Sequence, residues 1–207
     1  MARWQQGRFK MKLDHRWKAK PGHQIFIAQR GAIRLDIPRT WVVIPEKTSY
    51  KMCDRQPPDD ECTLEVSYMV LPDADLTGLT VSMMLRDVTD NQHQKTETWR
   101  GEIVEEKRGE MEMAQLATRW IDPSQNREAC SHIALARRRG IQALLTYDYW
   151  LDDAKQFGPV WLTVMETLRV AEWVTPDGRP APAPALPNEA FYDFKLASEM
   201  SRAKGRA

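Results

Sequence analysis

The chain has 207 residues and a mass of 24.0 kDa, enough for one substantial hydrophobic core with appendages. Thirty Lys and Arg residues against 29 Asp and Glu residues give a net charge of +1, which argues against a nucleic-acid-binding protein or one held on an anionic membrane. No apolar run is long enough to span a bilayer, and no signal-peptide-like apolar region is visible. Three cysteines, an odd number, therefore favour reduced thiols and a cytoplasmic location.

The first predicted element is a basic strand near the amino terminus. From residue 8 to residue 17, side chains such as Phe9, Leu13 and Trp17 alternate with charged ones, which is typical of a strand with one solvated face. A basic, aromatic segment is also typical of a nucleic-acid or membrane contact. The flat net charge favours an edge strand whose lysines discourage pairing with other sheets, within an extension that covers residues 1–22.

A hairpin is predicted next, with strands at 24–29 and 32–37 around Arg30-Gly31. Glycine supplies the positive φ of a tight turn, but arginine is not the favoured partner, so a bulged or longer turn stays open. A short apolar segment, 41–45, follows. Residues 49–61 are predicted to be a polar loop, because they contain two consecutive prolines and then three consecutive acidic residues.

Two segments in the middle of the chain fit both a helical and a strand period. Residues 63–71 are predicted to form a strand and 75–88 a helix, although a strand at 79–85 fits as well. Strands are predicted at 99–107 and 111–121. The second of these also fits a helix, but its place before a turn and a hairpin favours a continuous meander.

The clearest pattern is a hairpin followed by a helix. Residues 131–138 and 141–150 are predicted strands joined at Arg139-Gly140, and the second strand alternates strictly. The period then becomes helical over 159–168, with Pro159 suited to the first helical position. The helix is expected to bury Trp161 against the sheet.

The carboxyl-terminal part changes character. Five prolines between 175 and 187 indicate an extended linker, which we place at 173–187, after a single domain at 23–172. Asn188 then caps a predicted short helix that extends to Met200 within a tail at 188–207. This helix carries the candidate partner-docking residues Phe191, Phe194 and Leu196.

The order of elements resembles a known family. A strand that alternates Ile33, Leu35 and Ile37 and closes as Pro38-Arg39-Thr40-Trp41 is similar to the opening of the PsbP-like family, whose fold includes the Ran-binding Mog-type proteins. The resemblance covers residues 24–170. It implies a mainly antiparallel α+β sheet flanked by helices, arranged as an α/β/α sandwich. It also implies a non-catalytic accessory or binding role, as for a photosystem subunit, a Ran-binding factor and secretion-associated chaperones. The matching pieces are 63–71, 75–88, 99–150 and 159–168.

Two kinds of cysteine site were considered. Cys53, Cys62, Cys130 and His132 could together supply four zinc ligands, but their spacing does not match known zinc modules, so no metal is expected. A disulfide between Cys53 and Cys62 across the proline-containing loop would require an oxidising compartment. Three ordinary thiols are the favoured interpretation.

No phosphate-binding loop, nucleophile elbow or metalloprotease helix is present, and no cofactor is expected. Asp148, Asp152 and Asp153 are a possible acid/base group, although acids before a helix also complement its dipole. Ser131 and His132 are adjacent on a strand, so their side chains point to opposite sides and cannot act on each other.

The sequence therefore predicts a non-catalytic protein-binding or accessory module. Its partner would be another protein or a second copy, reached through the carboxyl-terminal tail. Two alternatives stay open: a small-molecule or lipid-binding protein with a pocket between sheet and helix, and an unrecognised hydrolase around the acids of 148–153.

Overall fold

The computed structural model describes residues 17–71, 76, 78–90, 96–175 and 179–182. Two α-helices lie in this part of the chain, α1 (Val81–Asp90) and α2 (Ala154–Thr167), and a short 3-10 turn (Leu151–Asp153) precedes α2. The strands are β1 (His23–Ala28), β2 (Ile33–Pro38), β3 (Val42–Pro45), β4 (Ser49–Cys53), β5 (Cys62–Val70), β6 (Glu97–Arg100), β7 (Val104–Arg108), β8 (Met111–Asp122), β9 (Arg127–Arg138), β10 (Ile141–Trp150) and β11 (Arg169–Val170).

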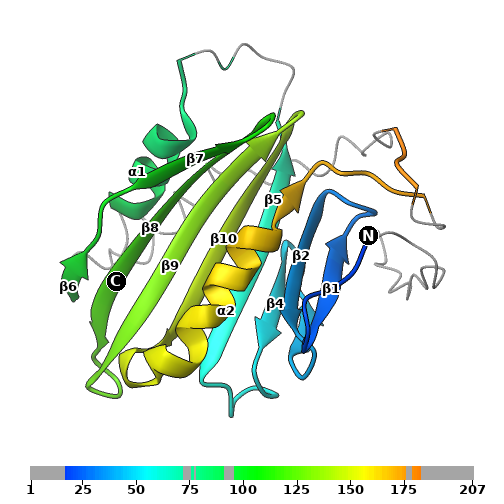
Figure 1. The fold of residues 1–207 in the computed structure, drawn as a ribbon. Coiled ribbons are helices and arrows are strands. Elements are labelled where there is room, and N and C mark those ends of the chain that lie inside the picture. The colour runs from blue at the N-terminus through cyan, green and yellow to red at the C-terminus, as the bar shows by residue number, and fades with distance from the viewer. Residues whose placement is uncertain (1–16, 72–75, 77, 91–95, 176–178, 183–207) are drawn as a thin grey trace.

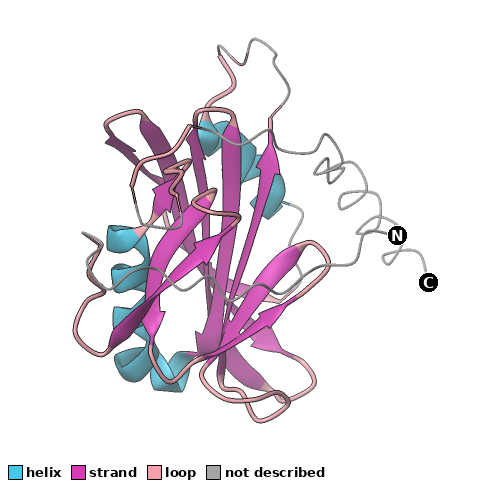
Figure 2. Cartoon of the chain, turned by 90° about the vertical axis from the view of Figure 1, so that its right-hand side faces the viewer, coloured by secondary structure: helices cyan, strands magenta, loops and turns pink. Residues whose placement is uncertain are grey.

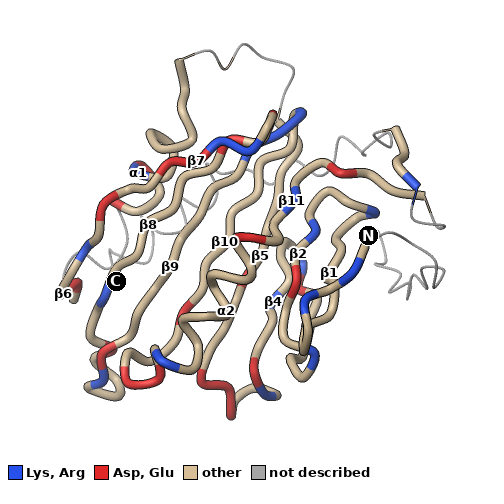
Figure 3. The backbone as a smooth tube through the Cα atoms, in the orientation of Figure 1, with Lys and Arg blue, Asp and Glu red and all other residues tan. Residues whose placement is uncertain are grey.

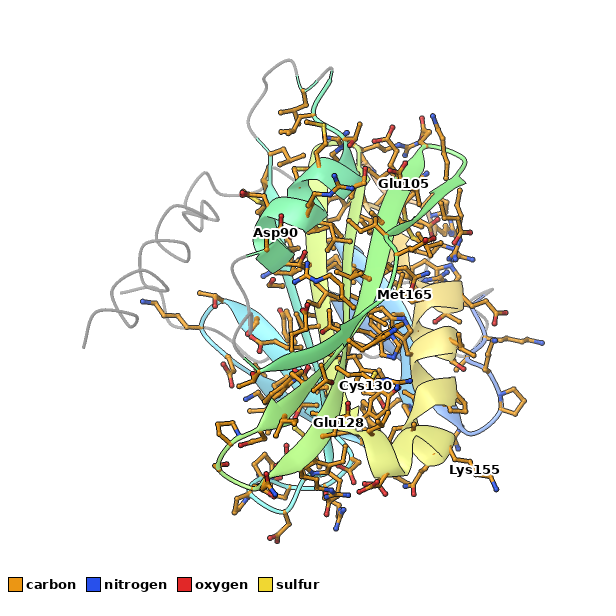
Figure 4. The ribbon with its side chains drawn as sticks, turned by 90° about the vertical axis from the view of Figure 1, so that its left-hand side faces the viewer. Asp90, Glu105, Glu128, Cys130, Lys155 and Met165 are labelled. Atoms are coloured by element: carbon orange, nitrogen blue, oxygen red, sulfur yellow. The ribbon has the colours of Figure 1, made fainter. Side chains whose placement is uncertain are left out.

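The strands form two antiparallel sheets. The large sheet has the order β3-β4-β5-β10-β9-β8-β6, with β7 also paired to β8. The small sheet has the order β1-β2-β11. The helices α1 and α2 cover opposite sides of the large sheet (Figures 1, 2 and 4), and the small sheet lies beside α2. We call the two sides of the large sheet the α1 side and the α2 side.

The main core lies on the α2 side. Alternate residues of β10 point to this side and are buried, as the period of two requires. They pack against the buried face of α2, made by Phe157, Trp161, Val164 and Met165, and against apolar residues of β2. A smaller cluster on the α1 side joins Val81 and Leu85 of α1 to β8 and β9.

Both predicted hairpin turns contain arginine with positive φ. In the β9–β10 turn, Arg139 and Gly140 have φ values of 46° and 73°, so this is a two-residue turn with two left-handed residues. The β1–β2 turn is longer, because residues 29–32 lie between the strands, and Gln29 and Arg30 also have positive φ. A Cβ atom at Gly31 would lie 2.0 Å from the Glu172 carbonyl oxygen, so only glycine fits there.

The loop predicted for 49–61 is wrong in its first part. Residues Ser49–Cys53 form β4, which pairs with both β3 and β5. Met52 and Cys53 are buried, and they point to opposite sides of the sheet. The polar residues Ser49 and Lys51 obscured this strand in the sequence, because they occupy the less apolar α1 side.

The helix predicted to begin at Pro159 begins five residues earlier, at Ala154. Pro159 is therefore inside α2, where it cannot donate to the carbonyl of Lys155. Both residues lie on the exposed side of the helix, so that carbonyl can be solvated. Burial of Phe157 explains why the helix extends toward its amino terminus in spite of the proline.

The other ambiguous segments are resolved by packing. The helix prediction for 75–88 is confirmed over α1, which the Thr80 hydroxyl caps by accepting from the Met83 N–H at 3.2 Å. The strand prediction for 111–121 is confirmed by β8. The single strand predicted at 99–107 is instead divided into β6 and β7, separated at Gly101–Ile103.

The carboxyl-terminal part of the described chain runs along the edge of the small sheet, next to β2 and the β1–β2 turn. Trp173 and Val174 are buried, and the Ala181 N–H donates to the Trp173 carbonyl at 2.9 Å. The domain and linker boundaries stay a prediction, and the core includes residues at the start of the predicted linker. The predicted strand at 8–17 and the tail at 188–207 lie outside the described residues, apart from Trp17. Among the helices described, none is long and apolar enough to cross a membrane.

The core position of Trp161 gives a stability prediction. Replacement of Trp161, which is 3% exposed, by alanine should lower the free energy of unfolding by about 3–5 kcal/mol, because a large cavity would remain. Urea denaturation measures this change. Met83, which is 55% exposed, is the control, and Met83→Ala should change stability by no more than about 0.5 kcal/mol. Equal losses for both variants would contradict the burial of Trp161.

Candidate functional site

The interface between α2 and the large sheet is filled by aromatic rings. His132, Tyr147 and Trp161 stack on one another, with centroids of the His132 and Trp161 rings 5.2 Å apart and those of the Tyr147 and Trp161 rings 6.1 Å apart. The Trp161 indole N–H donates to the Gln115 side-chain oxygen at 3.0 Å, and the Tyr147 hydroxyl donates to the Phe157 carbonyl at 3.1 Å. These rings occupy the space in which the sheet–helix pocket was predicted.

His132 and Cys130 lie side by side in this interface, on β9. Their Nε2 and Sγ atoms are 3.7 Å apart, and His132 Nε2 is 3.0 Å from the Tyr149 hydroxyl oxygen. Burial lowers the pKa of His132 to about 4 and raises the pKa of the Cys130 thiol. Both groups are therefore neutral near pH 7, whereas a nucleophilic cysteine needs a depressed pKa. The pair is a packed structural contact.

The three cysteines are divided between the two sides of the sheet. Cys62 and Cys130 point to the α2 side and Cys53 points to the α1 side, as their cross-strand pairs show. All three are buried and free. The zinc and disulfide alternatives therefore fail for a geometric reason, because the sheet itself separates Cys53 from the others. No group of three potential metal ligands occurs in the described part of the chain.

The acidic residues considered for catalysis do not form one site. Asp148 accepts a hydrogen bond from the Ser131 hydroxyl, which in turn accepts from the Trp120 indole N–H at 2.8 Å, on the α1 side. Asp152 and Asp153 instead pair with Arg127, at 3.5 and 3.0 Å. The latter contacts lie at the acidic end of the sheet (Figure 3).

The molecule's unexplained feature is a strip of exposed apolar side chains beside α2. Six large apolar side chains are exposed in the described residues. Four of them, Trp99, Val104, Ile121 and Leu162, lie on the same side and flank of the domain, and we call them the apolar strip. Their exposed fractions are 45%, 55%, 39% and 68%. The remaining two, Leu79 and Met83, lie in or next to α1.

Strand register places three members of the apolar strip on the same side of the large sheet. Odd-numbered residues of β8 point to the α2 side, because Gln115 contacts Trp161 of α2. Residues directly opposite each other in a sheet share a side. Val104 is opposite Gln115 and Trp99 is opposite Arg119, so both point to the α2 side, as does Ile121.

Helix geometry places Leu162 on the adjacent flank of α2. On one flank, the Thr167 hydroxyl accepts a hydrogen bond from the Asp36 N–H of β2 at 2.9 Å, so that flank faces the small sheet. Leu162 and Met165 share the opposite flank, because residues three apart on a helix are neighbours. This flank faces β7 and β8: Arg108 of β7 donates to the Met165 carbonyl at 2.5 Å, and Figure 4 shows Met165 there.

Trp99 is held in place by its neighbours. The guanidinium of Arg119 lies over its ring, 5.1 Å from the centroid. A Cβ atom at Gly101 would lie 2.9 Å from the Trp99 ring, so the missing side chain allows the ring to lie along the strand. The Gly101 N–H also donates to the Ala117 carbonyl at 2.9 Å. The exposed ring is therefore presented in a defined orientation.

The predicted site and the observed strip differ. The predicted docking residues Phe191, Phe194 and Leu196 lie outside the described residues and stay a prediction. The strip was missed, because its members come from β6, β7, β8 and α2 and are brought together by strand register. Only two features of the sequence indicated the strip. Leu162 is apolar at a position of α2 where the helical pattern predicts a polar residue, and Trp99 is apolar directly after a polar segment.

Comparison with known structures defines the class of the domain. The solution structure of the cyanobacterial PsbP protein (CyanoP) of Synechocystis sp. matches with a TM-score of 0.50 and 17% identity, over 72% of this chain and 92% of that one. A crystal structure from Bacteroides thetaiotaomicron matches with a TM-score of 0.52 and 14% identity, over 79% of this chain and 52% of that one. The domain therefore has a PsbP-like α+β fold, and that prediction is confirmed. These likenesses concern the fold alone and do not bear on the Ran-binding Mog-type resemblance.

Sequence comparison then identifies the family. The Alr1449 family model matches residues 24–174. The uncharacterized protein alr1449 of Nostoc sp. is 36% identical over 172 residues, which cover 83% of this chain and 89% of that protein. The chain belongs to the Alr1449 family.

The buried imidazole predicts an acid-sensitive fold. The folded His132 has a pKa of about 4, whereas an unfolded imidazole has one near 6.5. Between these values the unfolded state binds more protons, so stability falls as pH decreases, by about 2 kcal/mol from pH 7 to pH 5. Urea denaturation at both pH values measures the loss, and His132→Gln should remove most of this dependence. An unchanged dependence in the variant would show that other groups cause it.

The thiols give a second solution prediction. After denaturation without reductant, all three cysteines should react with a thiol reagent. In the folded protein they should react much more slowly, because burial hides them and raises the pKa of each thiol. Recovery of one thiol after denaturation would reveal a disulfide and contradict the separation of Cys53 from Cys62.

Proposed function

We propose that this protein is a non-catalytic protein-binding module and that the apolar strip is its binding surface. The observation that carries the proposal is the grouping of Trp99, Val104, Ile121 and Leu162 on one flank of the domain. Single exposed apolar residues are normal on soluble proteins, whereas a grouped set marks an interaction site. The PsbP-like fold is compatible with such a role.

The composition of the strip supports a protein partner. Tryptophan and arginine are enriched among the residues that contribute most to protein–protein binding, and Trp99 and Arg119 are stacked here. The Trp99 ring is also held against Gly101, so little side-chain entropy remains to be lost on binding. A rigid aromatic ring beside exposed aliphatic side chains suits an apolar protein segment.

The two alternatives have less support. A lipid or small molecule between sheet and helix would have to displace the stacked His132, Tyr147 and Trp161 rings. A hydrolase would need facing carboxylates, but Asp148 is engaged by Ser131 and the pair Asp152–Asp153 by Arg127. The arrangement supports binding at the surface over chemistry in the interior.

Site-specific photo-cross-linking in the producing cells tests the proposal. A photoreactive residue at position 104 or 162 should give a discrete adduct with a protein, because both positions are in the strip. Position 83 on the α1 side is a matched control, since Met83 and Val104 are both 55% exposed. Adducts from the strip positions and none from position 83 support the proposal. No adduct, or equal adducts at all three positions, would overturn it.

A further inference from the structure

The proposed binding surface raises the question of which segment covers it. Resting on the proposed function, we propose that the apolar strip of one chain is covered by residues 188–200 of a second copy. Two copies would then exchange their carboxyl-terminal segments, each strip receiving the tail of the other chain. The inference rests on the chemistry of the two surfaces and on where the described chain ends.

The segment 188–200 has the chemistry that the strip requires. It carries Phe191, Phe194 and Leu196, three large apolar side chains within six residues. A segment of this length is only marginally stable as an isolated helix, because about 12–15 residues are needed in water. Its apolar side chains therefore need a protein surface, and the strip offers exposed apolar area of the same kind.

The described chain ends on the other flank of the domain. The Val174 N–H donates to the Arg30 carbonyl at 2.9 Å, which places this part of the chain beside the β1–β2 turn. Ala181 is hydrogen-bonded to Trp173 nearby. The apolar strip is on the far side of α2, along β6, β7 and β8 (Figure 1). The small sheet and α2 therefore stand between the end of the described chain and its own strip.

The length of the segment after Pro182 favours docking on a second copy over docking on the chain's own strip. Phe191 lies nine positions after Pro182, a separation of about 28 Å when the chain is extended as polyproline at about 3.1 Å per residue. A route to the chain's own strip must pass over α2, whose diameter is about 10–12 Å, in addition to the width of the sheet. A second copy can approach with its strip facing the tail, and no such detour is then needed.

Light scattering on full-length variants tests this arrangement. The strip variant is Trp99→Ser with Leu162→Ser, the tail variant is Phe191→Ser with Phe194→Ser, and the control is Met83→Ser on the α1 side. Wild type and control should rise with concentration from 24.0 kDa toward twice that mass. The strip and tail variants should stay at the monomer mass. Thermal melting checks that each variant folds, and Leu162→Asp replaces the strip variant if Trp99→Ser unfolds the domain.

Mixing the two defective variants provides the decisive result. One intact tail and one intact strip should restore association in the mixture, although more weakly than in wild type, because one of the two contacts is missing. A wild type that is monomeric at every concentration would overturn docking on a second copy. Persistent association of the strip variant would overturn the strip as the docking surface.

The cross-linking experiment separates this inference from the proposed function. If wild type is monomeric but positions 104 and 162 still give adducts with another protein, the binding function stands and the exchange of tails fails. If no adduct forms at these positions, including a dimer adduct, both fail.

Discussion

The stacking of Trp161 on Tyr147 and His132 is the contact on which the rest of the fold depends. It attaches α2 to the centre of the large sheet, and the position of α2 in turn determines where the small sheet can pack. The stack also uses its polar atoms internally, since the Trp161 indole and the Tyr147 hydroxyl each donate to a neighbouring group. Because buried polar groups need such partners, the same side chains that fill the core also fix the orientation of α2.

The two sides of the large sheet carry different kinds of side chains. On the α2 side, rings and aliphatic side chains form a buried apolar interior, in which burial lowers the pKa of His132 and keeps it neutral near pH 7. On the α1 side, polar contacts such as the chain from Trp120 through Ser131 to Asp148 lie beside a smaller apolar cluster. Adjacent residues of one strand thus have unrelated environments. Ser131 and His132 are adjacent in the sequence, but their side chains point to opposite sides of the sheet.

The fold was predictable where a segment's environment is periodic. In β10, every second residue is buried, so the pattern could be interpreted without knowing the neighbours. In β4 the alternate side chains Ser49 and Lys51 are polar and lie on the α1 side of the sheet, opposite the polar residues Ser67 and Glu65 of β5. This environment depends on strand pairing, so the sequence of β4 alone does not show it. The start of α2 could not be predicted for a similar reason. The free energy gained by burying Phe157 exceeds the cost of Pro159 inside the helix, and this burial depends on the sheet. The apolar strip was not predicted, because no single segment contains it and only strand register brings its members to one side.

The glycine of the first hairpin has an effect beyond its own turn. Its missing side chain lets the chain at Glu172 lie directly on the β1–β2 turn, where the Glu172 N–H donates to the Gly31 carbonyl at 2.9 Å. Any larger residue at position 31 would push the chain at Glu172 away from this turn. This contact fixes the position of the chain at Glu172, and with it the positions of the buried residues Trp173 and Val174. The absence of one side chain at a tight turn therefore determines how closely the chain that follows α2 can lie against the first hairpin.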